Sequence, residues 1–261
     1  MKKAKKEVNI LEELKNKFKK DTKCKNSFIN FITDYNLTVN NNKYLLIFLD
    51  KMDMDLSDYL LENQKKIINL EIAKKIMLQV TKSIQCLHKI GIVYNDLKPD
   101  NVLINKKNTV SKLTDFNCIL KLEEENYNDI DKDYTGCSTG SYRSPEQIVD
   151  AVSYDIKADS WQLGILFMCI LQKNPRSFVS ILAKKYNTDR DDIINGLNEN
   201  IIDREIEKCK TEFIELNNKK EYNNLKVLIQ NLLTHIPEKR ITIEEIINSP
   251  FLKEINNKKT K

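Results

Sequence analysis

The chain has 261 residues, of which 41% are hydrophobic and 31% charged, and its net charge is +5. This balance is typical of a globular protein, and the length suits one large domain or two small ones. The longest apolar run, from Leu163 to Leu171, is too short to cross a bilayer, so no membrane span is expected.

The six cysteines are scattered without a C-x-x-C pair, and only two histidines accompany them. This spacing argues against a zinc site and against a disulfide framework, so free thiols in the cytosol are the expectation. The N-terminal stretch is lysine-rich and does not read as a signal peptide. Its lysines, and those at the other end, are expected on solvated surfaces, so no specific nucleic-acid partner is predicted. We therefore expect an intracellular protein of the cytoplasm.

Apolar periodicity predicts a small front with strands, followed by a larger helical body. Asn40 to Asn42 supply a turn between the first two strands, and Gly91 is a candidate C-cap for a long helix. In chain order the predicted elements are a helix over 5–18, strands over 28–35 and 43–49, a helix from Leu70 to near Gly91, and helices over 155–171, 224–234 and 242–248.

Two short motifs carry the chemistry: Tyr94-Asn95-Asp96-Leu97-Lys98-Pro99-Asp100-Asn101 and Thr114-Asp115-Phe116-Asn117. The residues between them read as two strands, which pair as a hairpin and bring Asn101 beside Asp115. An amide oxygen and a carboxylate then converge on one point, as a magnesium site requires. Either motif alone also fits turn chemistry. Both in order, with a strand pair between them, favour phosphoryl transfer to a hydroxyl.

With these motifs the chain resembles the eukaryotic-type protein kinase family, whose signatures include H-R-D-L-x-x-x-N and D-F-G. The resemblance implies that Asp96 is the catalytic base and that Lys98 steadies the transferring phosphoryl group. It assigns Asn101 and Asp115 to magnesium. The implied cofactors are ATP and Mg, and the implied partner is a protein with a serine or threonine to be phosphorylated. A regulatory protein partner is also left open.

The resemblance runs from Lys5 to Leu252 and implies further roles. Glu7 matches the glutamate of the family's C-helix. Leu49 matches the gatekeeper, Asp50 to Met52 the hinge that binds adenine, and Leu103 the floor of the adenine pocket.

In the helical body, Thr139 matches the threonine that meets the catalytic loop in Ser/Thr kinases. Asp159 matches the aspartate of the central helix, and Glu146 is expected to form a buried, bidentate ion pair with Arg240. The implied fold is α+β and two-lobed. Residues 1–52 form a partial N-terminal lobe with a helix, two strands and the hinge, and residues 53–261 form the helical C-terminal lobe.

Three departures from the family pattern concern the nucleotide and its control. The first glycine is Gly91 and only six residues precede Glu7. The glycine loop, the first three strands and their lysine are therefore expected to be missing. H-R-D reads Tyr94-Asn95-Asp96, so the arginine that binds a regulatory phosphate is lost. Tyr94 can still fill the place in a stack of apolar side chains that the histidine of H-R-D occupies in the family. D-F-G ends in Asn117, which is expected to tolerate the positive φ of the usual glycine.

The preferred interpretation is a Ser/Thr protein kinase that transfers the γ-phosphoryl group of MgATP. The alternative is a pseudokinase, or partial kinase, that acts as a protein-binding scaffold. A small-molecule kinase is disfavoured by the Thr139–Glu146 segment, which shapes the peptide site in protein kinases.

Overall fold

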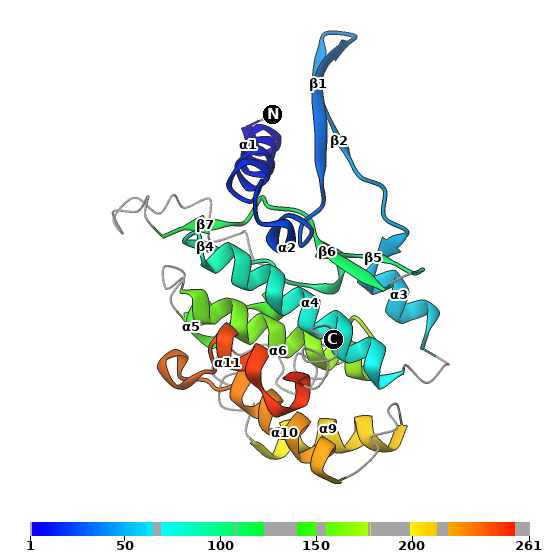
Figure 1. The fold of residues 1–261 in the computed structure, drawn as a ribbon, viewed down its shortest axis with the longest axis vertical. Helices are drawn as coiled ribbons and strands as arrows, with labels where there is room; N and C mark the ends of the chain where they lie inside the picture. The colour runs from blue at the N-terminus through cyan, green and yellow to red at the C-terminus, as the bar shows by residue number, and fades with distance from the viewer. Residues whose placement is uncertain are drawn as a thin grey trace.

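The computed structural model describes residues 2–64, 69–107, 109–122, 140–149, 155–176, 178, 199–212 and 219–253. Its helices are α1 (Lys2–Lys17), α2 (Thr22–Lys25), α3 (Leu56–Glu62), α4 (Leu70–His88), α5 (Pro145–Val149), α6 (Ile156–Gln172), α9 (Glu199–Glu212), α10 (Lys219–Leu232) and α11 (Ile243–Asn248). Its strands are β1 (Phe31–Val39), β2 (Asn42–Leu49), β3 (Met54–Asp55), β4 (Ile92–Val93), β5 (Val102–Asn105), β6 (Val110–Leu113) and β7 (Leu120–Lys121). Figure 1 shows α1 and the β1–β2 hairpin at one end, above the remaining helices.

Helix α1 buries the apolar face that its sequence spacing predicts. Val8, Leu11 and Leu14 are buried along the helix, and Phe18 is buried just after its last turn. The helix is also tied to the helical body through Glu13, whose carboxylate lies 2.9 Å from the Lys121 ammonium in β7. Burial of one stripe of apolar side chains therefore fixes which side of α1 faces the rest of the protein.

The β1–β2 hairpin forms as predicted, with its turn at the asparagines. Val39 pairs with Asn42, and Asn40 and Asn41 have φ angles of 48° and 63°. Asparagine tolerates this left-handed region better than most residues, and the twist of such turns suits paired strands. The strands continue to Phe31 and Leu49, where Leu49 packs against the hydrophobic core.

The second predicted hairpin is the antiparallel pair β5–β6, which β3 extends to a three-stranded sheet. Val102 pairs with Leu113, so the residues just outside the pair become neighbours. The Thr114 amide donates to the Asn101 carbonyl at 3.1 Å. This contact confirms that pairing brings the two sequence motifs together.

The helical body is built around α6, which is buried from Ala158 to Gln172. Beside it lies α4, whose predicted apolar face, from Leu70 to Leu87, is buried. Gly164 allows a close approach on another side of α6, because a Cβ there would stand 2.7 Å from Leu233 Cδ2. Because α6 has so little exposed surface, it can anchor the loops that contact it. None of the described helices is long and apolar enough to cross a membrane.

The expectation of free thiols was wrong for part of the chain. Cys24 in α2 and Cys86 in α4 form a disulfide with Cα atoms 5.6 Å apart. Cys118 is also disulfide-bonded, whereas Cys169 and Cys209 are buried thiols that form no disulfide. Cys24 and Cys86 are 62 residues apart in the sequence, so only the packing of α2 on α4 brings them together. No local spacing signal exists for such a pair.

Candidate active site

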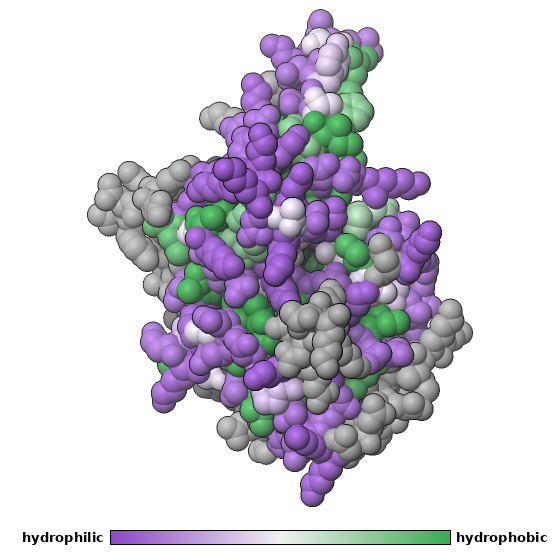
Figure 2. Space-filling model, viewed as in Figure 1, coloured by the Kyte–Doolittle hydropathy of each residue, from purple (hydrophilic) through white to green (hydrophobic). Residues whose placement is uncertain are grey.

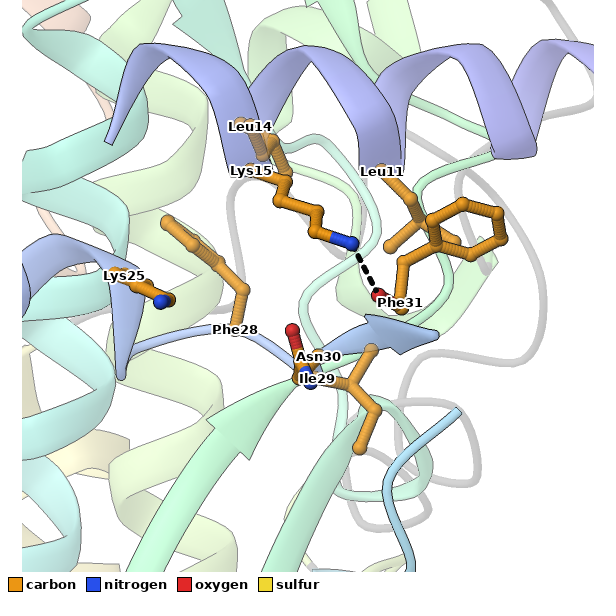
Figure 3. Close-up of a pocket in the computed structure, with 8 residues that line it drawn as sticks. All are labelled: Leu11, Leu14, Lys15, Lys25, Phe28, Ile29, Asn30 and Phe31. Carbon is orange, nitrogen blue, oxygen red and sulfur yellow. Dashed lines mark hydrogen bonds between the residues drawn. The ribbon is translucent and has the colours of Figure 1, made fainter. Parts of the chain in front are cut away.

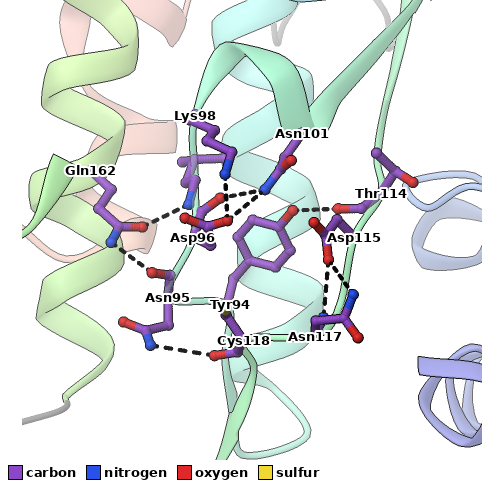
Figure 4. Close-up of polar contacts among 11 residues, drawn as sticks. Tyr94, Asn95, Asp96, Lys98, Asn101, Thr114, Asp115, Asn117, Cys118 and Gln162 are labelled. Carbon is purple, nitrogen blue, oxygen red and sulfur yellow. Dashed lines mark hydrogen bonds and ion pairs between the residues drawn. The ribbon is translucent and has the colours of Figure 1, made fainter. Parts of the chain in front are cut away.

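Asp96, Lys98 and Asn101 form one contact network between β4 and β5 (Figure 4). The Lys98 ammonium lies 2.8 Å from Asp96 Oδ2, and Asn101 Nδ2 donates to the same oxygen at 3.0 Å. Asn101 Nδ2 also donates to the Asp96 carbonyl at 2.8 Å. Asp96 is 5% exposed. Two donors on one oxygen fix the orientation of the carboxylate, as a general base requires.

The backbone of this loop is held by the buried carboxylate of Asp159 in α6. Its two oxygens accept hydrogen bonds from the amides of Tyr94 at 2.9 Å and Asn95 at 2.8 Å. His88 Nε2, at the end of α4, lies 2.7 Å from Asp159 Oδ2. Charged acceptors make hydrogen bonds about twice as strong as neutral ones, so Asp159 anchors the loop to the most buried helix.

Gln162, one turn further along α6, holds the next part of the same loop. Its Oε1 accepts from the Leu97 amide at 2.8 Å, and its Nε2 donates to the Asn95 carbonyl at 2.9 Å. Sequence reasoning singled out Asp159 and missed Gln162 and His88. The i, i+3 spacing of Asp159 and Gln162 places both on one face of α6, and this is the signal that could have found the glutamine.

Asn95, which stands where the family motif has arginine, has a left-handed backbone with φ 69°. Its Oδ1 accepts a hydrogen bond from Gln147 Nε2 at 2.5 Å, and its Nδ2 donates to the Cys118 carbonyl at 3.3 Å. The short amide therefore links the catalytic loop to α5 and to the segment after Asp115 without any charge.

Tyr94 fills the apolar stack, as predicted. Its ring meets Phe116 edge-on at 5.9 Å, Phe116 meets Phe28 at 5.9 Å, and Phe28 stacks on Phe18 at 5.7 Å. The Tyr94 hydroxyl donates to the Thr114 carbonyl. Burial raises the pKa of this phenol well above its ordinary value. An unbroken line of aromatic rings thus connects the end of α1 to the catalytic loop.

The turn after β6 differs from the expectation in its backbone. The positive φ falls on Asp115, at 56°, and Asn117 has none. Asn117 instead donates twice to Asp115 Oδ1, from its backbone amide at 3.2 Å and from Nδ2 at 2.8 Å. Asn117 therefore contributes to the turn by capping Asp115 with its side chain and its amide, and not by adopting a positive φ.

The same amide joins Asp115 to Glu7 on α1. Asn117 Nδ2 also lies 3.3 Å from Glu7 Oε2. Burial, and then the nearby charge of Asp115, raise the pKa of Glu7, while the hydrogen bond from Asn117 lowers it. Among the described residues, no lysine or arginine pairs with Glu7. A neutral amide therefore bridges two acids at the point where the resemblance implies a lysine.

The residues at the predicted metal site fit magnesium. Both Asn101 contacts with Asp96 use its Nδ2, so the amide oxygen is the atom that can face a cation. Asp115 Oδ1 takes the Asn117 donors, and within the described chain no hydrogen bond reaches Oδ2. One amide oxygen and one carboxylate oxygen are hard ligands of the kind that Mg²⁺ prefers alongside phosphate.

The predicted adenine-binding residues come from three parts of the chain. Leu49 ends β2, Asp50 and Met52 lie in the segment between β2 and β3, and Leu103 lies in β5, the central strand of the β3–β5–β6 sheet. The Asp53 amide donates to the Ile104 carbonyl at 3.1 Å, so the residue just after the predicted hinge lies beside β5. Leu49, Met52 and Leu103 are each half-buried and packed against the core. Asp50 is held at the base of the hairpin, where its amide donates to the Asn30 carbonyl at 3.0 Å.

Glu146 and Arg240 form the bidentate pair that the sequence predicts, at 2.7 and 2.9 Å. The Arg240 side chain is fully buried and that of Glu146 is 11% exposed. Thr139 lies outside the described residues.

A separate pocket lies between α1 and the segment that leads into β1 (Figure 3). Lys15 Nζ crosses it and donates to the Phe31 carbonyl at 3.2 Å. None of the predicted site residues lines it, so we assign it no part in the reaction. Its lining residues are Leu11, Leu14, Lys15, Lys25, Phe28, Ile29, Asn30 and Phe31.

The family profile of the protein kinase domain matches residues 1–252, and the chain therefore belongs to the protein kinase family. This match and the mostly helical architecture confirm the predicted protein kinase fold. Similar proteins include kinases that are named as Ser/Thr-specific. A probable serine/threonine-protein kinase CCRP1 of Zea mays is 28% identical over 83% of this chain and 30% of its own length.

Serine/threonine-protein kinase unc-51 of Caenorhabditis elegans is 32% identical over 76% of this chain and 21% of its own length. MAP kinase-activated protein kinase 2 of Homo sapiens is 31% identical over 69% of this chain and 41% of its own length. The chain thus spans less than half the length of these three relatives.

Proposed function

We propose that this chain acts as a Ser/Thr protein kinase that moves the γ-phosphoryl group of MgATP to a serine or threonine of another protein. The observation that carries the proposal is the Asp96–Lys98–Asn101 network on a loop anchored by Asp159. A binding scaffold needs none of these contacts at this spacing, whereas phosphoryl transfer uses all of them.

The site residues have defined tasks in this proposal. Asp96 accepts the proton of the attacking hydroxyl, and its orientation comes from Asn101 and Lys98. Lys98 also offers its positive charge to the phosphoryl group in transit. Asn101 and Asp115 would hold magnesium, which supplies charge neutralisation along the triphosphate when bound. The half-buried Leu49, Met52 and Leu103 are the proposed contacts for adenine. Residues 1–52 and 53–261 are the two proposed lobes.

The test is Asp96→Asn, measured as phosphate transfer to a serine or threonine peptide. Loss of the general base should abolish transfer, since such groups contribute about 10²–10⁴-fold to rate. Asp100→Asn is the matched control, because Asp100 is an exposed carboxylate four residues further along. A rate of transfer by Asp96→Asn within a few-fold of the parent rate would refute the assignment of Asp96 as the catalytic base.

The alternative, a pseudokinase that serves as a scaffold, is favoured by one contact. Glu7 meets the Asn117 amide instead of a cation, so no described charge links α1 to the triphosphate. The chain also has no glycine before Gly91 to form a phosphate loop. Each charge-assisted phosphate contact is worth about 1.5–3 kcal/mol. Loss of two should weaken MgATP binding at least ~100-fold relative to a complete site.

Calorimetry with MgATP on the 261-residue chain decides between the two functions. Weak binding with detectable transfer supports a kinase with a low basal rate. No binding at millimolar nucleotide, together with no transfer, supports the scaffold. Low-micromolar, magnesium-dependent binding would contradict the predicted weakening and would show that another group completes the site.

A further inference from the structure

The β1–β2 hairpin exposes a continuous apolar face. Tyr35 pairs with Leu46 and Leu37 with Tyr44 across the strands. Directly paired residues point to the same side of a sheet, and alternate residues of one strand share a face. Six large apolar side chains therefore lie together, each between 37% and 61% exposed. They form what we call the outer hairpin face: Tyr35, Leu37, Val39, Tyr44, Leu46 and Phe48.

The opposite face of the same hairpin is used differently. Leu45, Ile47 and Leu49 point to that side and pack against the hydrophobic core beside α1. The hairpin's charged residues, Asp34 and Lys43, also belong to it. In a sheet with one buried face, the solvent side usually carries the polar residues. Here the side toward solvent is uncharged and, apart from Thr33 and Asn42, apolar, which is the reverse of the pattern for a surface that stays in water.

The outer hairpin face is large for a surface left in water. Three of its residues are aromatic and about half exposed. Aromatic side chains bury about 150–250 Å² each, so these three offer about 300 Å², and the three aliphatic side chains raise the apolar area to about 500 Å². The largest apolar patch on a typical monomer is about 300–600 Å². Figure 2 shows hydrophobic atoms along the side of the projecting hairpin.

We propose that the outer hairpin face is a self-association surface on which a second copy of this chain packs its own hairpin. Two such faces together bury about 1,000 Å², the lower bound for a specific interface. The face carries no charge, so two copies meet without like charges opposed, although the chain carries a net +5.

The shape of the surface also favours a second hairpin over a peptide. Two sheets stack face to face about 10 Å apart and nearly aligned, which covers the side chains of both. An added strand would instead pair with a backbone edge and leave the outer hairpin face in water. If a two-fold axis relates the two hairpins, both copies use the same face, and the apolar residues of one outer hairpin face pack against those of the other.

Sedimentation velocity and light scattering across the micromolar range test this proposal. The parent chain should dimerise, and Leu46→Glu should weaken dimerisation at least about tenfold, because it buries two carboxylates against apolar rings. Thr38→Glu is the matched control: Thr38 is exposed, lies in the same hairpin and points to the opposite side, where it pairs with Lys43. This variant should dimerise like the parent.

Hydrogen exchange on residues 31–49 locates the interface. Their amides should gain protection as the parent concentration rises, and not in Leu46→Glu. Thermal melts of both variants check that the fold is kept, which is expected because both positions are exposed. A parent that stays monomeric overturns the proposal and leaves the surface to a different protein. A dimer that Leu46→Glu does not weaken overturns it as well.

Discussion

Replacing Arg240 by alanine is the sharpest test of the fold. The Arg240 guanidinium is fully buried and makes two hydrogen bonds to the Glu146 carboxylate. It also donates to three backbone carbonyls, those of Thr234 and Lys157 at 2.8 Å and that of His235 at 3.2 Å. Arg240→Ala removes the only described cation on Glu146 and leaves its carboxylate 11% exposed.

The expected loss follows from what the arginine leaves behind. Breaking a buried pair by removing one partner costs about 3–5 kcal/mol, since a desolvated charge stays unpaired. Carbonyls that water cannot reach would add to that loss. A typical domain is stable by about 5–15 kcal/mol, so Arg240→Ala should remove a large share of the free energy of unfolding. Urea denaturation gives the free energy directly.

The exposed pair between Lys106 and Glu62 is the control. Their side chains lie 2.6 Å apart, yet 43% and 53% of their surfaces are exposed. Lys106→Ala should therefore cost less than about 1 kcal/mol. Adding Glu146→Gln to Arg240→Ala should recover part of the loss, because the stranded charge is removed. A destabilisation by Arg240→Ala no larger than that of Lys106→Ala would refute the argument.

Two further predictions concern contacts that only the structure reveals. Replacing Cys24 and Cys86 together by serine should destabilise the fold by about 4 kcal/mol, because their bond closes a loop of 62 residues; a thermal melt unchanged in that variant would show that the bond does not form. Asn117→Ala removes the hydrogen bond that lowers the pKa of Glu7, so this pKa should rise further. A carboxyl group whose pKa is higher in the folded than in the unfolded protein stabilises the fold at pH values below its unfolded-state pKa. This stabilisation is lost as the pH rises through its folded-state pKa. Stability of Asn117→Ala should therefore fall more than that of the parent between weakly acidic and neutral pH, and parallel pH–stability curves would contradict the role of the amide.

Local patterns in the sequence account for most elements and for the central residues of the site. Apolar spacing predicts α1, α4 and both hairpins because each buries one face, and a buried face leaves a period in the sequence. The residues between Asp96 and Asp115 are few, and the β5–β6 pair brings the two motifs together. Their proximity could therefore be argued from strand pairing alone.

Contacts between distant segments could not be predicted in this way. The bond between Cys24 and Cys86 depends on how α2 packs against α4. The amide bridge from Asn117 to Glu7 depends on where α1 lies. The presence of asparagine in place of the glycine of D-F-G did not by itself indicate this contact. In the sequence, the residues of the outer hairpin face indicated only that strands form there. The alternation of side chains along a strand does not say which side of a hairpin meets solvent.

The backbone of Asn95 has a consequence for the conditions under which the catalytic loop keeps its shape. A left-handed φ of 69° is less strained for asparagine than for arginine. Both side-chain bonds of Asn95, to Gln147 and to the Cys118 carbonyl, join neutral groups. Mobile ions screen attraction between exposed charges and leave neutral hydrogen bonds almost untouched. These contacts of Asn95 should therefore hold equally in dilute buffer and in strong salt, where a loop ordered by arginine and phosphate would loosen.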